Sequence, residues 1–413
     1  MEDWVKMKIE NVVLKTKLKD PNKNPDITFK YVDVSGVSNT LFKIDNYAIL
    51  FGKEAPSRAR KLINFQDIIF ATVRPTLMRI ALVPQELDSE VCSTGYCVLK
   101  PNQEKIVPQF LYYSVLTDSF IEKISQLQKG ASYPAIRDSD LKNQILYLPP
   151  LPEQRKIAHV LSTVLKAIEH QDNLIRTTTE LKKALMQKLF KEGTRGEPKK
   201  ETEIGLVPES WEVVRIGDMY EFTSKPRGLD IGSPIPFIPM DMVPLNELEI
   251  NKYVLRDQVS SGTYVENGDL LLAKITPSFE NGKQGFVSID KPFAYATTEV
   301  IPIKEKEGLS HKFYLYYFLL KDDIRSQLTG KMEGSTGRQR LSKTVLEETL
   351  IPKPSLAEQI EIAKLYISFD KKISVCNSKK QTLTALFKTL LHELMTGQRR
   401  VHEVEFEVRK TLV

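Results

Sequence analysis

This sequence of 413 residues contains an internal repeat with a period near 205 residues. The colinear matches include DIIFATVRPT (67–76) with DLLLAKITPS (269–278), PPLPEQRKIA (149–158) with PSLAEQIEIA (354–363), and KALMQKLF (183–190) with KTLLHELM (388–395). Short matching segments at Trp4 and Trp211 open the two copies. Because a repeat constrains the architecture before any local prediction is made, we expect two similar halves that arose by duplication.

The first part of each half predicts a mixed α/β domain. Short apolar runs bounded by Pro and Gly, such as residues 68–70 and 270–272, are typical of strands. Stretches near 110–127 and 312–328 predict brief helices. The predicted fold class is therefore α+β, with two similar mixed α/β domains separated by two long helices that form an antiparallel coiled coil.

Each of the two long helices is predicted from one narrow apolar stripe. The stripe positions follow one another in alternating steps of four and three, which is the 3.5-residue period of a coiled coil. We call these positions the seam: Ile157, Leu161, Val164, Ile168, Gln171, Ile175, Thr178, Lys182, Leu185 and Leu189 in the first helix, and Ile362, Tyr366, Phe369, Ile373, Cys376, Lys380, Leu383, Phe387, Leu390 and Leu394 in the second. Since a whole domain separates the helices in sequence, they can pair antiparallel. The alternative is that each helix packs on the core of its own domain.

The domain boundaries follow from these patterns. We predict a first domain at 1–150, a first spacer helix at 151–192, a linker at 193–210, a second domain at 211–353, a second spacer helix at 354–400 and a C-terminal tail at 401–413. The linker is charged, contains Gly and Pro and lacks periodicity, which is typical of an exposed connection.

The composition, with 41% hydrophobic and 27% charged residues, is that of a soluble globular protein. No apolar run predicts a membrane span, and the N-terminal residues lack the layout of a secretory signal. Three cysteines, Cys92, Cys97 and Cys376, are too few for a disulfide framework, so we predict a cytoplasmic protein. Lys and Arg number 59 against 53 Asp and Glu, a net charge of +6 that permits an anionic partner without establishing one.

The sequence lacks the motifs of common catalytic and metal sites. No Gly-Lys pair is followed by the Ser or Thr of a phosphate-binding loop. His392 and Glu393 begin like a zinc-protease helix, but Thr396 stands where the second histidine would be. The Pro-Pro pair at 149–150 is flanked by leucines and does not form the base-gripping motif of an adenine methyltransferase. We therefore predict a non-catalytic protein without a metal or cofactor of its own.

The stretch PPLPEQRKIA, which precedes a leucine-rich helix and recurs as PSLAEQIEIA, resembles the specificity subunit of type I restriction-modification enzymes. The resemblance covers essentially the whole chain. It includes the Trp4 and Trp211 segments, the two matching strands, and the stretches GASYPAIRDSDL and GSTGRQRLSKTVL that precede the spacer helices. The second copy departs from the motif at Ala357 and Ile360, which argues against a special role for Arg155.

The resemblance implies a DNA-binding subunit without catalytic activity. Each domain would be a target-recognition domain for one half of a bipartite target in double-stranded DNA. The paired helices would set the spacer and dock two modification subunits, and restriction subunits would join for cleavage. These partners would hold the S-adenosylmethionine and the ATP. A duplicated chain suits this role, because paired DNA-binding units have to lie a defined distance apart.

Basic, amide and aromatic side chains in loops are the candidates for contact with DNA, since Lys and Arg reach phosphates and Arg, Lys, Asn and Gln reach base edges. In the first half the candidates are Lys53, Arg58, Arg60, Lys61, Arg74, Arg79, Tyr133 and Arg137. In the second half they are Lys225, Arg227, Lys274, Lys283, Arg338, Gln339 and Arg340. We favour residues 334–340 as a set, because a flexible Gly-Ser-Thr-Gly loop followed by Arg-Gln-Arg can fit a groove. The alternative for each residue is a solvated surface position.

Other classes of protein stay open at this point. A fused methyltransferase-nuclease would transfer methyl groups without partners. A coiled-coil scaffold would need the paired helices and no DNA. A loose DNA binder would retard random DNA equally with and without modification subunits.

Overall fold

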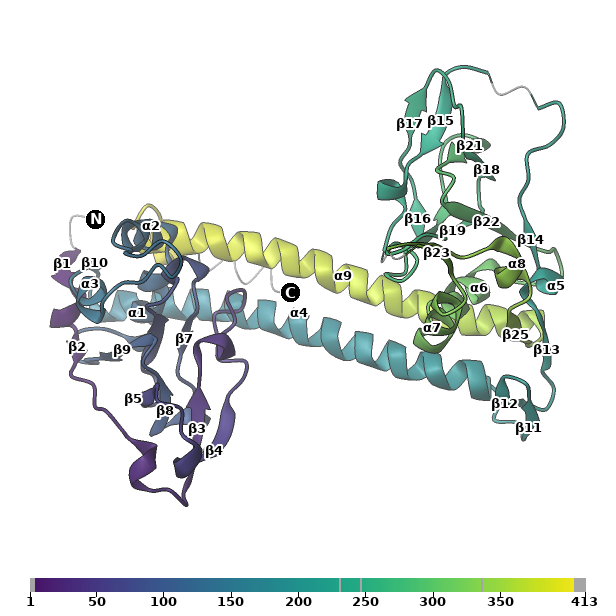
Figure 1. Cartoon of the computed structure of the whole chain (residues 1–413). Coiled ribbons are helices and arrows are strands. Elements are labelled where there is room, and N and C mark those ends of the chain that lie inside the picture. The colour runs from purple at the N-terminus through teal and green to yellow at the C-terminus, as the bar shows by residue number, and fades with distance from the viewer. Residues whose placement is uncertain (1–3, 230–231, 246, 336, 405–413) are drawn as a thin grey trace. The chain divides into compact units, whose positions relative to one another are not determined.

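The computed structural model of the chain describes residues 4–229, 232–245, 247–335 and 337–404. The chain forms two compact units, drawn in Figure 1. The first unit contains the residues up to 175 together with those from 375 onward, and the second contains residues 176–374. The division runs through both long helices. Each unit therefore combines one mixed α/β domain with a part of each helix.

The first unit contains two four-stranded sheets, ordered β2-β9-β6-β7 and β4-β3-β8-β5. The strands are β2 (Val13–Leu14), β3 (Thr28–Val32), β4 (Ala48–Phe51), β5 (Ala59–Ile63), β6 (Ile68–Ala71), β7 (Ile80–Leu82), β8 (Glu90–Ser93) and β9 (Tyr96–Pro101). Successive strand residues point to opposite faces. Accordingly Ile68 and Phe70 join the core on one face of β6, and Ile69 joins the core on the other. Burial on both faces explains why this strand is an uninterrupted apolar run.

The second unit repeats this arrangement, with sheets ordered β14-β22-β19-β20-β16 and β17-β15-β21-β18. The strands are β14 (Tyr220–Phe222), β15 (Ile235–Ile238), β16 (Glu249–Ile250), β17 (Val254–Arg256), β18 (Thr263–Glu266), β19 (Leu270–Ala273), β20 (Gln284–Val287), β21 (Phe293–Ala296) and β22 (Val300–Glu305). Here β19 matches β6, with Leu270 and Leu272 in one core and Leu271 in the other. The predicted mixed α/β character of both halves is confirmed.

Short helices and paired strands complete each domain. In the first unit they are α1 (Pro108–Leu116), α2 (Asp118–Gln126), α3 (Asp138–Lys142), β1 (Val5–Lys8) and β10 (Ile145–Leu148). In the second they are α5 (Ile216–Met219), α6 (Lys312–Leu319), α7 (Asp322–Thr329), α8 (Lys343–Glu347), β13 (Glu212–Arg215), β23 (Glu333–Ser335), β24 (Arg338–Arg340) and β25 (Leu350–Lys353). Antiparallel pairing of β1 with β10, and of β13 with β25, ties the start of each domain to its end.

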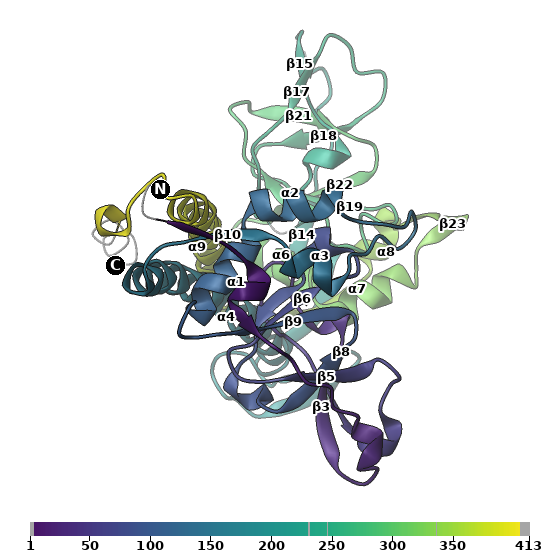
Figure 2. The same ribbon diagram turned by 90° about the vertical axis from the view of Figure 1, so that its left-hand side faces the viewer.

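The two long helices, α4 (Leu151–Glu192) and α9 (Leu356–Met395), pack together in antiparallel fashion. In the first unit Leu161 of α4 shares a core with Leu390 of α9, and Figure 2 shows the two helices there nearly end on. In the second unit Leu189 near the end of α4 shares a core with Ile362 near the start of α9. The predicted antiparallel pair is confirmed. Both cores also contain domain residues, so each helix packs on a domain as well as on its partner helix.

Every seam position is buried or half-buried, including the polar ones. Two of these polar positions form ion pairs between the helices. Nζ of Lys182 lies 2.5 Å from Oδ1 of Asp370, and Lys380 pairs with Asp172. The lysine follows the acid by ten positions in both helices, so the two ion pairs fit one antiparallel register.

Two segments differ from the sequence prediction. The linker at 193–210 contains a hairpin of β11 (Lys199–Thr202) and β12 (Gly205–Pro208). The sequence shows no alternation of apolar and polar residues here, because Val207 is the main buried apolar residue of the hairpin. At the start of the predicted tail, Val401 and Val404 are buried in the core of the first unit. The rest of the tail, residues 405–413, lies outside the described residues.

Candidate nucleic-acid interface

In the first unit, the end of β6 is joined to a turn and to the loop after α2. The backbone nitrogen and Oγ1 of Thr72 both donate to the carbonyl of Gly95, at 2.8 and 2.9 Å. The nitrogen of Arg74 donates to the carbonyl of Pro134 at 2.7 Å, and the nitrogen of Ile136 donates to the carbonyl of Thr72 at 3.0 Å. We call residues 72–76, 93–95 and 132–137 the first loop site.

Arg74 and Tyr133 lie together at the first loop site, as a stacked pair on the surface. The guanidinium carbon of Arg74 is 5.1 Å from the ring centre of Tyr133, and Nη2 donates to the carbonyl of Ser132 at 3.3 Å. Tyr133 is 72% exposed. Arg74 also has a positive φ of 48°, which is uncommon for a residue other than glycine. A cation over an exposed ring offers both hydrogen-bond donors and a stacking surface to a nucleic acid.

The second unit repeats this backbone arrangement at the end of β19. The nitrogen of Lys274 donates to the carbonyl of Glu299 at 2.9 Å, and the nitrogen of Leu341 donates to the carbonyl of Lys274 at 2.8 Å. The nitrogen of Thr276 donates to the carbonyl of Gln339 at 3.0 Å, and the nitrogen of Gln339 donates to Oγ1 of Thr276 at 3.1 Å. We call residues 274–278, 297–299 and 338–342 the second loop site.

Four predicted DNA-binding residues therefore meet at the second loop site: Lys274, Arg338, Gln339 and Arg340. Arg338 and Arg340 are exposed, while Lys274 and Gln339 are half-buried. The favoured segment contains the antiparallel strands β23 and β24, which project from their unit in Figure 2. Gly334 adopts a φ of +134° with the Arg338 carbonyl close behind it, so a side chain there would clash. Thr336 lies outside the described residues.

Glu299 is a carboxylate that the sequence analysis missed. Arg340 forms a bidentate ion pair with it: Nε donates to Oε2 at 2.9 Å and Nη2 donates to Oε1 at 2.8 Å. The hydrogen bonds from Arg340 lower the pKa of Glu299, and the positive charges of Lys274 and Arg338 lower it further. The carboxylate is 22% exposed. The site thus holds three cations around one ionised acid.

Other predicted DNA-binding residues have partners inside their own unit. Arg79 donates to the backbone carbonyls of residues 34, 35 and 37. Arg60 pairs with Asp20 at 3.5 Å, and Lys61 pairs with Asp138 at 2.6 Å. These donors hold neighbouring loops in place, as does Lys283, whose Nζ donates to the carbonyl of Met240 at 2.9 Å.

The remaining candidates have exposed side chains away from these internal contacts. They are Lys53, Arg58, Arg137, Lys225 and Arg227. Lys53 lies over the ring of Phe51, with Nζ 5.5 Å from the ring centre. The case for DNA contact is therefore strongest at the two loop sites and at these exposed side chains, and it stays a prediction.

The glutamine of the repeated Glu-Gln motif ties each long helix to its domain. Oε1 of Gln154 accepts from the nitrogen of Val107 at 2.9 Å, just before α1. Oε1 of Gln359 accepts from the nitrogen of His311 at 2.9 Å, just before α6. Both glutamines also donate to the carbonyl five residues earlier, at 2.9 and 3.1 Å. They are 1% and 0% exposed, so these bonds are shielded from water.

The glutamate of the same motif has a different set of partners in each unit. Glu358 is 2% exposed and accepts from Nε1 of Trp211 at 3.0 Å and from the nitrogen of Thr194 at 2.9 Å. Glu153 is 22% exposed and accepts from Nη1 of Arg400 at 2.8 Å. The sequence analysis did not single out these residues for this role, and the repetition of Glu-Gln in both copies is the signal that could have found them.

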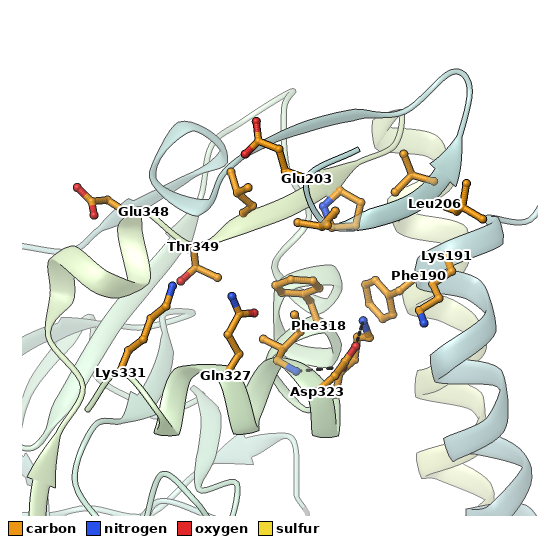
Figure 3. Close-up of a pocket in the computed structure, with 16 residues that line it drawn as sticks. Phe190, Lys191, Glu203, Leu206, Phe318, Asp323, Gln327, Lys331, Glu348 and Thr349 are labelled. Carbon is orange, nitrogen blue, oxygen red and sulfur yellow. Dashed lines mark hydrogen bonds and ion pairs between the residues drawn. The ribbon is translucent and has the colours of Figure 1, made fainter. Parts of the chain in front are cut away.

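A cavity of about 430 Å³ lies beneath the β11–β12 hairpin, between α7 and the end of α4 (Figure 3). It is lined by apolar residues such as Phe190 and Phe318 and by charged ones such as Lys331. Lys321 pairs with Asp323 at 3.2 Å at its edge. None of the predicted DNA-binding residues lines this cavity. It belongs to the packing of the hairpin rather than to the candidate interface.

Comparison with known proteins bears on the whole chain. The family model described as type I restriction modification DNA specificity domain matches residues 1–176 and again 208–385. Two proteins of Methanocaldococcus jannaschii are similar. One, named a putative type I restriction enzyme MjaX specificity subunit, is 26% identical over 97% of this chain and 94% of its own length. The other, the type I restriction enzyme MjaVIII specificity subunit, is 27% identical over 72% of this chain and 71% of its own.

Solved structures give the same picture. One chain, from the structure described as the structural basis underlying complex assembly and conformational transition of the type I R-M system, is 27% identical, with a TM-score of 0.56 over 96% of this chain and 98% of its own. The S subunit from M. genitalium is 18% identical, and its TM-score of 0.60 over 95% of this chain and 96% of its own supports the fold.

No helix in the described part of the chain has the length and apolar character needed to cross a lipid bilayer. The two family matches fall on the two copies of the repeat, as the duplication predicted. The chain therefore belongs to the type I restriction-modification DNA specificity family and is a specificity subunit of that class.

Proposed function

We propose that this chain recognises a bipartite DNA target, with each unit contacting one half through its loop site. The observation that carries the proposal is that the same backbone arrangement occurs twice with different side chains on it. In both units a buried strand ends beside a turn and a loop, joined by equivalent hydrogen bonds. Two equal supports with different contact residues suit the recognition of two different short sequences.

The side chains at the two loop sites favour contact with DNA. Arg74 with Tyr133 supplies a cation and an exposed ring in the first unit. Lys274, Arg338 and Arg340 supply positive charge in the second. Phosphate contacts of this kind fix the position of a protein on the duplex, and Arg donors in the major groove discriminate between bases.

The helix pair is proposed to set the distance between the half-sites and to dock two modification subunits. The ion pairs of Lys182 and Lys380 support a fixed register between the helices. In this proposal the chain itself is non-catalytic and acts in the cytoplasm. The modification subunits would bind S-adenosylmethionine, and restriction subunits would bind ATP. Kinship with named specificity subunits supports this division of labour.

Methylation mapping of a host that carries this chain with its modification subunit tests the proposal. We expect modified adenines or cytosines in a motif of two short sequences separated by a gap of fixed length. The purified chain alone should transfer no methyl group and cut no DNA. Methyl transfer by the chain alone, with contaminants excluded, would contradict the proposal. Modification without any bipartite motif would contradict it as well.

A further inference from the structure

The two loop sites differ at one pair of equivalent positions. At the end of the buried strand, the backbone nitrogen of Thr72 donates to the carbonyl of Gly95 in the first unit. In the second unit, the backbone nitrogen of Lys274 donates to the carbonyl of Glu299. Each of these two acceptor residues directly precedes a matching central strand, β9 or β22. The first unit therefore has no side chain beyond hydrogen where the second has a carboxylate.

The partner of that carboxylate is also replaced in the first unit. Strand-end residue Val73 forms a β-bridge with Ala135, and its counterpart Ile275 forms a β-bridge with Arg340. Ala135 thus occupies the position of Arg340. The Glu299–Arg340 ion pair corresponds to a Gly–Ala pair in the other copy, and both charged members are present in only one of the copies.

The ion pair fixes the orientation of the Arg340 guanidinium. Nε and Nη2 both donate to the carboxylate, and a two-armed contact of this kind restricts the rotation of the group. Because a guanidinium has five N–H donors, the contact leaves donors on the outer side available to a ligand. Arg340 is half exposed, at 50%. A side chain ordered before binding loses less entropy when the ligand arrives.

The same carboxylate lowers the positive charge of the site. Lys274, Arg338 and Arg340 all act on the charge of Glu299. A site with these three cations alone would attract the phosphates of any DNA sequence. A carboxylate among them opposes that general attraction, while the oriented donors of Arg340 remain.

We propose that Glu299 is a positioning residue for sequence discrimination by the second unit. It orients Arg340 toward the bases of one half-site and reduces contact with DNA of unrelated sequence. The inference rests on the proposed function and assigns to one half of the target a determinant that the other half lacks.

The test uses the full complex of this chain with its modification subunits and measures binding to the mapped target, to variants with one base changed in either half, and to unrelated DNA. The variants are Glu299→Gln, Arg340→Ala, these two combined, and the reversed pair Glu299→Arg with Arg340→Glu. Glu212→Gln is the matched control, since Glu212 forms an ion pair with Lys353 in the same unit at 2.7 Å, outside the loop site.

We expect Glu299→Gln to lower the discrimination against changed bases in one half-site by about tenfold, within the range of one base contact. Discrimination in the other half should stay unchanged, and binding to unrelated DNA should not weaken. The combined variant should behave like Arg340→Ala alone, because Glu299 acts through Arg340. The control should match the unaltered chain in every measurement.

Three results would overturn the inference. The first is unchanged discrimination in Glu299→Gln. The second is an equal loss in both half-sites, which indicates general loosening of the fold. The third is full discrimination when the pair is reversed, Glu299→Arg with Arg340→Glu. This result would show that the ion pair only holds the two segments together and that the guanidinium at position 340 does not discriminate between bases. Failure of the proposed function is distinguishable, because the unaltered complex would then show no half-site preference at all.

Discussion

The two halves of the molecule begin their long helices with the same Glu-Gln pair but use only the glutamine in the same way. Gln154 and Gln359 make equivalent bonds to the backbone of their domains. Glu358 is buried and binds Trp211, whereas Glu153 is partly exposed and binds Arg400. The indole nitrogen of Trp4, the counterpart of Trp211, is buried without a hydrogen-bond partner among the described residues.

This difference teaches which parts of the duplicated unit are constrained. In the second unit, the segment after α4 passes directly over Glu358, so close that a side chain on Gly193 would lie 2.7 Å from Oε1. The partners of the motif glutamate therefore depend on which chain segment passes over it in each copy. The loop sites follow the same rule, with a common backbone and different side chains. The hydrogen bonds to the backbone are the same in both copies, and the side-chain contacts differ.

The largest effect is expected from lengthening the helix pair. This change tests whether the pairing of the two helices sets the distance between the half-sites. One heptad inserted after Thr178 and one after Ile373 preserve the seam and leave both ion pairs intact, because each insertion falls between the acid and the lysine of its helix. Seven residues add roughly 10 Å. At about 3.4 Å per base pair, the half-sites should move apart by up to roughly three base pairs, with their bases unchanged.

Methylation mapping of the lengthened chain measures this shift. The same insertion in α4 alone is the control and should abolish modification, since the helices would then be out of register. An active enzyme that keeps the original gap would show that the helices do not set the spacing.

The next largest effect is expected at the two motif glutamates. Glu358→Ala leaves the indole of Trp211 and the nitrogen of Thr194 without their acceptor inside the protein. We expect a loss of about 3 kcal/mol in the free energy of unfolding of the second unit. Glu153→Ala removes one partly exposed ion pair and should cost about 1 kcal/mol or less. Denaturant unfolding followed by tryptophan fluorescence measures both. Equal losses would remove the contrast between the halves.

A third prediction concerns the contact residues of the two loop sites. Arg74→Ala should relax discrimination in one half-site, and Arg338→Ala should relax it in the other, each by roughly 1–3 kcal/mol if the arginine holds a base. Arginines that contact only phosphates should instead weaken all sequences alike and lower the salt slope by about one. Binding to targets altered in one half, measured at several salt concentrations, separates these outcomes. Relaxation of the same half by both variants would break the assignment of one half to each unit.

The smallest effect is expected where the halves agree. Asp67 and Asp269 precede the matching strands β6 and β19, and burial raises the pKa of each carboxyl to about 6. Because this pKa is above the unfolded value, the folded state binds more protons, and each carboxyl should favour folding more strongly at pH 5 than at pH 7, by about 1 kcal/mol.

Unfolding titrations of Asp67→Asn and Asp269→Asn measure these contributions. Each variant should lose its part of the pH dependence, by a similar amount in the two units. A pH dependence identical to that of the unaltered chain would mean that the carboxyls titrate normally in the folded protein.

The sequence predicts the features that repeat and misses those that depend on contacts between distant residues. The fold class and the antiparallel helix pair follow from a period that recurs in both copies. In contrast, Arg79 reaches carbonyls more than 40 residues away, and no local pattern distinguishes it from the exposed Arg74. Glu299 was missed for the same reason, since its partner Arg340 is 41 residues away in the sequence and is brought close by contacts of both segments with the end of β19.

The buried glutamine at the start of each long helix has a mechanical consequence. Because Gln154 and Gln359 bond at both ends to shielded backbone groups, the first turn of each long helix is fixed to its own domain. Rotation of that turn against the domain would break hydrogen bonds that water cannot easily replace, so each domain and the start of its helix should move as one body.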